Sequence, residues 1–92
     1  MSEIEYMLEK ETQKLITEKY GKKISNVSIQ YNYLPRDDIH FFNVLWYVNG
    51  RKFAGGNQLT PDDMIDIAAA GLKDNHISNT YHWIDKSLGV NQ

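Results

Sequence analysis

The dipeptide Asn49-Gly50 is the sequence feature that most constrains the fold. It separates residues 39–48, which are rich in β-branched and aromatic side chains, from the shorter stretch 51–55. Asn-Gly favours a two-residue type I′ turn, because that turn requires positive φ at both central positions. We therefore expect a β-hairpin whose register is fixed by this turn.

The register of this hairpin assigns its side chains to two faces, because cross-strand partners share a face. Trp46 is expected opposite Phe53, and Tyr47 opposite Lys52. The predicted core face holds Phe42, Val44, Trp46, Val48 and Phe53. The other face holds Phe41, Asn43, Leu45, Tyr47, Lys52 and Ala54. Phe41, Leu45 and Tyr47 form a candidate contact patch there, unless a helix or a second copy of the chain covers it.

Two further elements precede the hairpin. Residues 3–20 are predicted to be a helix that starts with a Ser2–Glu5 capping box and ends at Gly21. Its expected apolar stripe consists of Ile4, Leu8 and Leu15, with Met7 and Ile16. The next segment is a strand, since Val27, Ile29, Tyr31 and Tyr33 alternate with polar residues. Residues 34–38 form the following turn.

After the hairpin, Gly55-Gly56-Asn57 is expected to lead into a second helix, with Thr60 as N-cap and Pro61 at the first helical position. The apolar stripe of this helix is Met64, Ile67, Ala68, Gly71 and Leu72, and Asn75 is the expected stop. A third helix is predicted at about residues 80–88, beginning at Asn79 or Ser78. The expected fold class is α+β, with residues 1–92 forming a single domain of order α-β-β-β-α-α. Its three strands are antiparallel, with the helices on one face.

Composition excludes several classes of protein. The 92 residues contain no cysteine, which rules out disulfides and cysteine-based metal sites. No apolar run reaches the roughly 18 residues of a membrane span, and the acidic start does not resemble a signal peptide. The expectation is a cytoplasmic protein without a membrane contact, in the host cytoplasm if the gene belongs to a phage.

The net charge of −2 conceals an uneven distribution. Residues 1–18 carry five acids and two bases, residues 19–52 six bases and two acids, and residues 53–92 five acids and two bases. Antiparallel strands place Lys22, Lys23, Arg51 and Lys52 at one end of the sheet and Arg36 alone at the other. Together with Tyr47, these bases form the candidate partner-binding site, in which the tyrosine ring is a stacking platform. A solvated surface of mixed charge is the alternative explanation.

No catalytic, metal-binding or cofactor-binding residue is predicted. His82 and Asp85 are three residues apart on a helix, but two ligands do not make a metal site. Asp37-Asp38 belongs to a turn and Asp62-Asp63 to a helix start, so structure accounts for both pairs. The expected protein is therefore not an enzyme.

The segment Phe42-Asn43-Val44-Leu45-Trp46-Tyr47-Val48-Asn49-Gly50-Arg51-Lys52-Phe53, followed by Ile67-Ala68-Ala69-Ala70, is similar to the double-stranded-RNA-binding domain. The similarity covers roughly residues 3–74 and implies an α-β-β-β-α topology. In that family the helix after the third strand opens with lysines that clamp phosphates. This chain has Asp62 and Asp63 there, so the resemblance implies the topology more than the RNA function.

The whole chain also resembles the small single-domain anti-CRISPR inhibitors that phages make. The resemblance rests on a short, acidic, cysteine-free chain with an aromatic-rich surface and no catalytic constellation. It implies steric obstruction of a protein or protein–RNA complex of a bacterial host by a monomer or weak dimer, with direct RNA contact as one option. The basic middle would face guide RNA, and the acidic helices would mimic DNA phosphates. A nucleic-acid-binding module is the alternative function.

Overall fold

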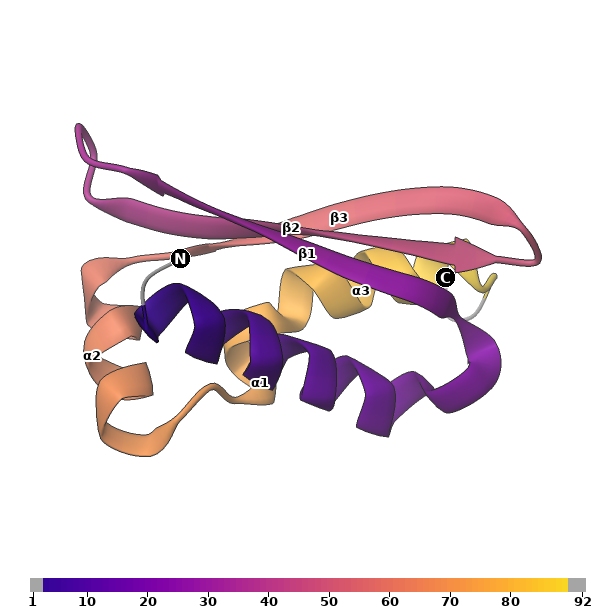
Figure 1. The fold of residues 1–92 in the computed structure, drawn as a ribbon, viewed down its shortest axis with the longest axis horizontal. Helices are drawn as coiled ribbons and strands as arrows, with labels where there is room; N and C mark the ends of the chain where they lie inside the picture. The colour runs from indigo at the N-terminus through magenta and orange to yellow at the C-terminus, as the bar shows by residue number, and fades with distance from the viewer. Residues whose placement is uncertain (1–2, 90–92) are drawn as a thin grey trace.

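The computed structural model describes residues 3–89 of the chain. The α-helices and strands are α1 (Glu3–Tyr20), β1 (Ser25–Leu34), β2 (Ile39–Val48), β3 (Arg51–Leu59), α2 (Pro61–Ala70) and α3 (Ser78–Ser87). Two 3-10 turns, Gly21–Lys23 and Asp74–Ile77, precede β1 and α3. The strands form one antiparallel sheet in the order β1-β2-β3, and all three α-helices lie on the same side of it (Figure 1). The predicted α+β architecture, with helices on one face, is confirmed.

The hairpin has the register that the Asn49-Gly50 turn predicts. Trp46 pairs with Phe53 and Tyr47 with Lys52, while φ is +52° at Asn49 and +80° at Gly50. The predicted core face is also confirmed. Its most buried members are fully inaccessible: Phe42, Val44 and Trp46. The second face of the sheet, which we call the outer face, has no helix over it (Figure 1).

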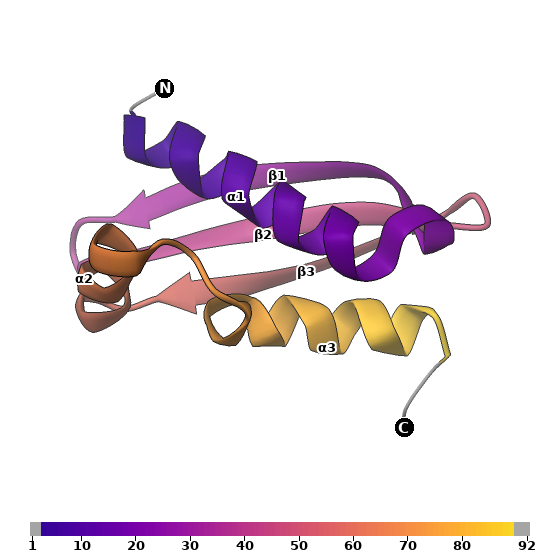
Figure 2. The same cartoon turned by 90° about the horizontal axis from the view of Figure 1, so that it is seen from below.

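The helix α1 has the predicted bounds, but its buried stripe differs from the prediction. The buried side chains are four residues apart: Leu8, Thr12, Ile16 and Tyr20. Ile4, predicted to belong to the stripe, is 40% exposed. The reason is the diagonal course of α1, whose first turns extend past the free edge of β1 (Figure 2). The Ser2 half of the predicted capping box lies outside the described residues.

The strand β3 is longer than predicted, and the expectation that Gly55-Gly56-Asn57 leads out of the sheet was wrong. These residues continue the ladder, since Gly55 pairs with Val44 and Gly56 with Asn43. A Cβ atom on Gly55 would lie 2.9 Å from Trp83 Cβ, so this glycine permits close packing of α3 against β3. The glycines serve close packing here and do not form a turn.

The helix α2 starts as predicted and ends earlier than predicted. The Thr60 side chain accepts from Asp63 N at 3.2 Å, and Thr60 N donates to Asp63 Oδ2 at 2.9 Å, which completes a capping box. The stop is Gly71, with φ of +85°, and its N–H donates to Ile67 O at 2.7 Å. The predicted stop at Asn75 was wrong, because that residue lies in the turn Asp74–Ile77.

The stripe of α2 is narrower than predicted. Ile67 and Leu72 are buried and Met64 packs against the core, whereas Ala68 is exposed.

The helix α3 begins at Ser78, one of the two predicted starts, and ends at Ser87. Asn57 Oδ1 accepts from Thr80 N at 2.8 Å, so a side chain of β3 holds the first turn of α3.

Candidate functional site

Three cross-strand neighbours define one end of the sheet. Ser25 of β1 pairs with Tyr47 of β2, and Tyr47 pairs with Lys52 of β3. The turn that carries Lys22 and Lys23 therefore adjoins the same end as the hairpin tip (Figure 1). The β1–β2 turn, which contains Arg36, is at the opposite end of the strands. The predicted gathering of four bases at one end, with Arg36 apart, is present.

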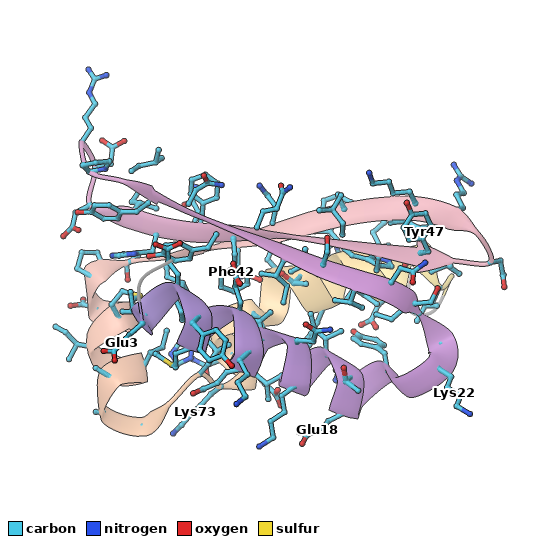
Figure 3. The ribbon with its side chains drawn as sticks, viewed as in Figure 1. Glu3, Glu18, Lys22, Phe42, Tyr47 and Lys73 are labelled. Carbon is cyan, nitrogen blue, oxygen red and sulfur yellow. The ribbon has the colours of Figure 1, made fainter. Side chains whose placement is uncertain are left out.

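These bases are divided between the two sides of the sheet. Lys52 shares the outer face with Tyr47, and Figure 3 shows Lys22 on the helix side, below the sheet. Arg51 belongs to the core face, where its guanidinium carbon lies 5.4 Å from the centre of the Phe53 ring. Among Lys22, Arg51 and Lys52, it is Lys52 that shares a face with Tyr47. The tyrosine ring can therefore serve as a stacking platform beside Lys52.

Two lysines that the sequence prediction left out join this end. Lys19 is in the last turn of α1 and lies 4.8 Å from the Tyr81 ring centre, while Lys86 lies 5.4 Å from that of Trp83. The ends of α1 and α3 meet where the Tyr20 hydroxyl donates to Asp85 Oδ1 at 2.8 Å. The sequence could have indicated Lys19 as a member of this end, because it lies three positions before Lys22. Lys86 could not be found in this way, because its position depends on the direction in which α3 runs.

We call this set of six residues the basic end: Lys19, Lys22, Lys23, Arg51, Lys52 and Lys86. The opposite end of the molecule is acidic, because the start of α1, the β1–β2 turn and the start of α2 meet there (Figure 1). We call its carboxylates the acidic end: Glu3, Glu5, Asp37, Asp38, Asp62, Asp63 and Asp66. The molecule is 36 Å long, so its opposite charges are separated along the long axis. Each end has a surplus of one charge and is still mixed, because Glu18 adjoins Lys19 and Asp85 adjoins Lys86 at the basic end, while Arg36 lies in the β1–β2 turn at the acidic end.

Several acidic side chains also have structural contacts. Asp63 belongs to the capping box of α2, and Asp38 Oδ1 accepts from the Tyr33 hydroxyl at 2.9 Å. Asp38 has φ of +50°, a conformation that Asp and Asn tolerate better than most residues. Asp62 and Asp66 are exposed on α2. The first turn of α2 thus presents negative charge where the double-stranded-RNA-binding domain has lysines.

The outer face carries the predicted apolar patch and a polar hollow beside it. Phe41, Leu45 and Tyr47 are each half-buried on β2, with no helix above them. An open hollow of about 430 Å³ lies at the edge of this patch. It is lined by Phe41, Asn43, Gly56, Asn57, Gln58 and Asn79, none of which is charged. The alternative that a helix covers this face does not hold for residues 3–89, since α3 lies on the same side of the sheet as α1 (Figure 1).

Two tyrosines between the helices have raised pKa values. Burial, and then a hydrogen bond to Asp85, raises the pKa of Tyr20. Burial, and then a hydrogen bond to Asp74, raises the pKa of Tyr81 in the same way. Their rings meet edge to face with centres 5.9 Å apart. This pair joins the last turn of α1 to the first turn of α3.

The described part of the chain contains no group of three metal-ligating side chains. Among the same residues, no helix combines the length and the apolar character needed to cross a membrane. Comparison of the chain with protein-family models, with curated proteins and with solved structures finds no match.

Proposed function

We propose that the protein is a non-enzymatic interaction protein that places its basic end on the RNA-bearing surface of a bacterial CRISPR-type complex and obstructs it sterically. The observation that carries this proposal is the gathering of six basic residues at one pole of the fold. Lysine and arginine attract phosphates without reading a sequence, and they release counterions when they bind. A nucleoprotein complex offers such phosphates on a shaped surface.

The net charge of −2 does not oppose this contact. The Debye length at physiological ionic strength is about 8 Å, whereas the molecule is 36 Å long. A phosphate-bearing surface at the basic end is therefore screened from most of the carboxylates at the acidic end. The basic end and the acidic end each interact mainly with charges close to them. One chain can therefore contact an anionic surface and a cationic surface at the same time.

The acidic end gives the proposal its second contact. A complex that binds DNA has a basic groove, and carboxylates on a rigid support can occupy it as phosphates would. The exposed members Asp62 and Asp66 lie on one helix, which holds their spacing. Occupation of the groove by this end would exclude DNA, which supports inhibition by obstruction.

A nucleic-acid-binding module is the alternative, and the α-β-β-β-α order supports it. The charge on the first turn of α2 opposes the mode of binding of the double-stranded-RNA-binding domain, because Asp62 and Asp63 would repel phosphate there. The two functions differ in what the isolated protein binds. A module binds free RNA with an affinity that falls steeply with salt, whereas the proposed inhibitor requires the protein–RNA complex.

The test uses immobilised protein and a purified RNA-loaded CRISPR complex, with free guide RNA and the RNA-free protein as separate ligands. We expect the complete complex to be retained and its binding to target DNA to decrease. Lys52→Glu should weaken retention, and Lys73→Glu is the matched control, because Lys73 is an exposed lysine far from the basic end (Figure 3). Retention of free RNA alone favours the module, and retention of no ligand contradicts both functions.

A further inference from the structure

The two edges of the sheet differ in how they are protected. Unpaired backbone groups at a sheet edge form a template for another strand, and proteins usually block such edges. The blocking devices are charged side chains, proline, bulges and covering helices or loops. In β3 the edge is blocked: Asn79 Nδ2 donates to Gly56 O at 2.6 Å, and Trp83 packs over Gly55.

From Ser28 to Leu34 the edge of β1 has no charged side chain, proline or bulge, and the first turns of α1 lie on the helix side of the sheet and leave the edge open in the plane of the sheet (Figures 1 and 2). Its one irregularity is the bulge between Ser25 and Ser28, where Asn26 has φ of +51°. From Ser28 to Leu34 the strand pairs regularly with β2 and contains no charged residue, proline or glycine. This segment is long enough to support a further row of backbone hydrogen bonds.

From this contrast we infer that β1 is the interface for a second copy of the chain. The two β1 strands pair antiparallel about a two-fold axis, and the two sheets join into one of six strands. This contact is isologous, so it closes at the dimer and leaves both outer edges blocked by α3.

Charge complementarity identifies a second copy as the occupant. With the axis at Gln30, the start of β1 in one copy lies beside the end of β1 in its partner. The 3-10 turn with Lys22 and Lys23 precedes that start, and Asp37 and Asp38 follow that end. Antiparallel pairing therefore sets the basic turn before β1 of one copy beside the acidic turn after β1 of its partner. The two-fold axis repeats this contact at the other end of the interface between the two β1 strands, which we call the seam.

The side chains of the paired strands are also compatible. Alignment on Gln30 places Ile29, in the regular part of β1, opposite the partner's Tyr31. Aromatic and β-branched residues form favourable cross-strand pairs. Tyr33 and Leu34 are 44% and 42% exposed, so the partner strand would cover apolar surface that the monomer leaves in water.

The course of α1 fits the same arrangement. The helix overhangs the β1 edge at its N-terminal turns and recedes beneath the middle of the sheet at its C-terminal turns (Figure 2). A two-fold axis at the middle of β1 brings the overhang of each copy to the recess of the other. Ile4, on the overhanging turns, is 40% exposed and would lie beneath the partner's sheet.

The first test is a matched pair of substitutions on the two edge strands, measured by sedimentation equilibrium over a concentration series. The wild type should reach twice its 10.7 kDa mass. Gln30→Lys places like charges opposite each other at the axis and should raise the dimer dissociation constant about fivefold or more. Gln58→Lys makes the same change on the outer face of β3 and should leave it unchanged. A monomer at every concentration, or a dimer sensitive to Gln58→Lys alone, overturns the inference.

The second test exchanges charges across the seam. Lys22→Glu with Lys23→Glu, and separately Asp37→Lys with Asp38→Asn, should each weaken the homodimer about tenfold or more. Asn at position 38 retains the positive φ and a side-chain oxygen for Tyr33. An equimolar mixture of the two variants should restore dimers, because both seams then join opposite charges. A mixture that stays monomeric contradicts the proposed register.

The dimer and the proposed function share Lys22 and Lys23, so variants at other positions are needed to separate the two. Lys52→Glu changes the basic end on β3, away from the β1 edge, and should affect partner binding alone. Gln30→Lys should affect assembly alone. A monomeric wild type that still binds the complex would refute the dimer and leave the proposed function standing.

Discussion

Trp46 Nε1 donates a hydrogen bond to Ser87 Oγ at 2.9 Å, which connects the central strand β2 to the last residue of α3. The Ser87 hydroxyl in turn donates to Ile84 O at 2.7 Å. Trp46 is fully inaccessible, so its indole N–H has this serine in place of water. The largest side chain of the core is thereby both packed and hydrogen-bonded.

Substitution of this tryptophan should be severely destabilising. Trp46→Ala removes the packed ring and leaves a cavity, at an expected cost of about 3 to 5 kcal/mol in the free energy of unfolding. Urea denaturation followed by circular dichroism measures the change. A folded variant with an unchanged midpoint would show that the hairpin face is assigned incorrectly.

Ser87→Ala isolates the hydrogen bond from the packing. The indole N–H would lose its partner while the ring stays in place, so the expected cost is about 1 to 3 kcal/mol. Ser78→Ala is the control, because that serine is exposed at the start of α3. Equal effects of the two substitutions would show that the hydrogen bond between Trp46 and Ser87 does not stabilise the fold.

The Asn49-Gly50 turn gives a second prediction. Gly50 has φ of +80° and open space around its Cα, so a substitution there meets backbone strain and no collision. Gly50→Val should cost about 1 to 2 kcal/mol, since a β-branched residue resists the left-handed conformation. Gly50→Asn should cost less, because Asn adopts positive φ more readily. Equal melting temperatures for the two variants would contradict this account of the turn.

Two fully buried threonines should respond with opposite signs to the same change. Thr12 Oγ1 has no hydrogen-bond partner within residues 3–89, whereas Thr80 Oγ1 donates to Asn57 Oδ1 at 2.6 Å. Thr12→Val should therefore stabilise by about 1 kcal/mol, and Thr80→Val should destabilise by a similar amount. Thermal unfolding of both variants provides the measurement, and the same sign for both would contradict it.

Stability should fall in alkaline solution because of Tyr20 and Tyr81. The folded state raises the pKa of both hydroxyls above the unfolded value of about 10. Their contribution is complete below that pH, and it decreases as the pH rises further, since the unfolded chain ionises first. Tyr20→Phe with Tyr81→Phe should flatten the dependence of melting temperature on pH above about pH 10. An identical slope for the wild type and the variant would refute this assignment.

The hairpin was predictable because its signal is local. The two residues Asn49-Gly50 set the turn, the turn sets the register, and the register sets which side chains face the helices. The capping box at Thr60 is equally local. These features depend on residues within a few positions of one another, so one sequence is sufficient to find them.

The missed features depend on contacts between distant segments. Gly55 and Gly56 have the local character of a turn, but Gly55 provides room for Trp83, which is 28 positions away in the chain. Tyr20 belongs to the buried line of α1 because its hydroxyl reaches Tyr81 O and Asp85 of α3. The same reason applies to the site, where Lys86 reaches the basic end only through the direction of α3.

The most direct test of the basic end as the contact surface compares two charge variants for retention of the RNA-loaded CRISPR complex. One variant combines Lys22→Glu, Lys23→Glu and Lys52→Glu, and leaves Arg51 in place because its guanidinium stacks on Phe53. The other combines Asp62→Asn with Asp66→Asn and preserves the capping residue Asp63. Gln30→Lys, tested in parallel, shows what loss of the dimer alone does to retention.

The measured quantity is the dissociation constant of the complex at two salt concentrations. We expect the lysine variant to lose retention and most of the salt dependence, and the aspartate variant to retain the complex. Loss of binding in the aspartate variant alone would make the acidic end the main contact. Unchanged binding in both variants would contradict contact through the basic end. The interface would then lie at Phe41, Leu45 and Tyr47 on the outer face.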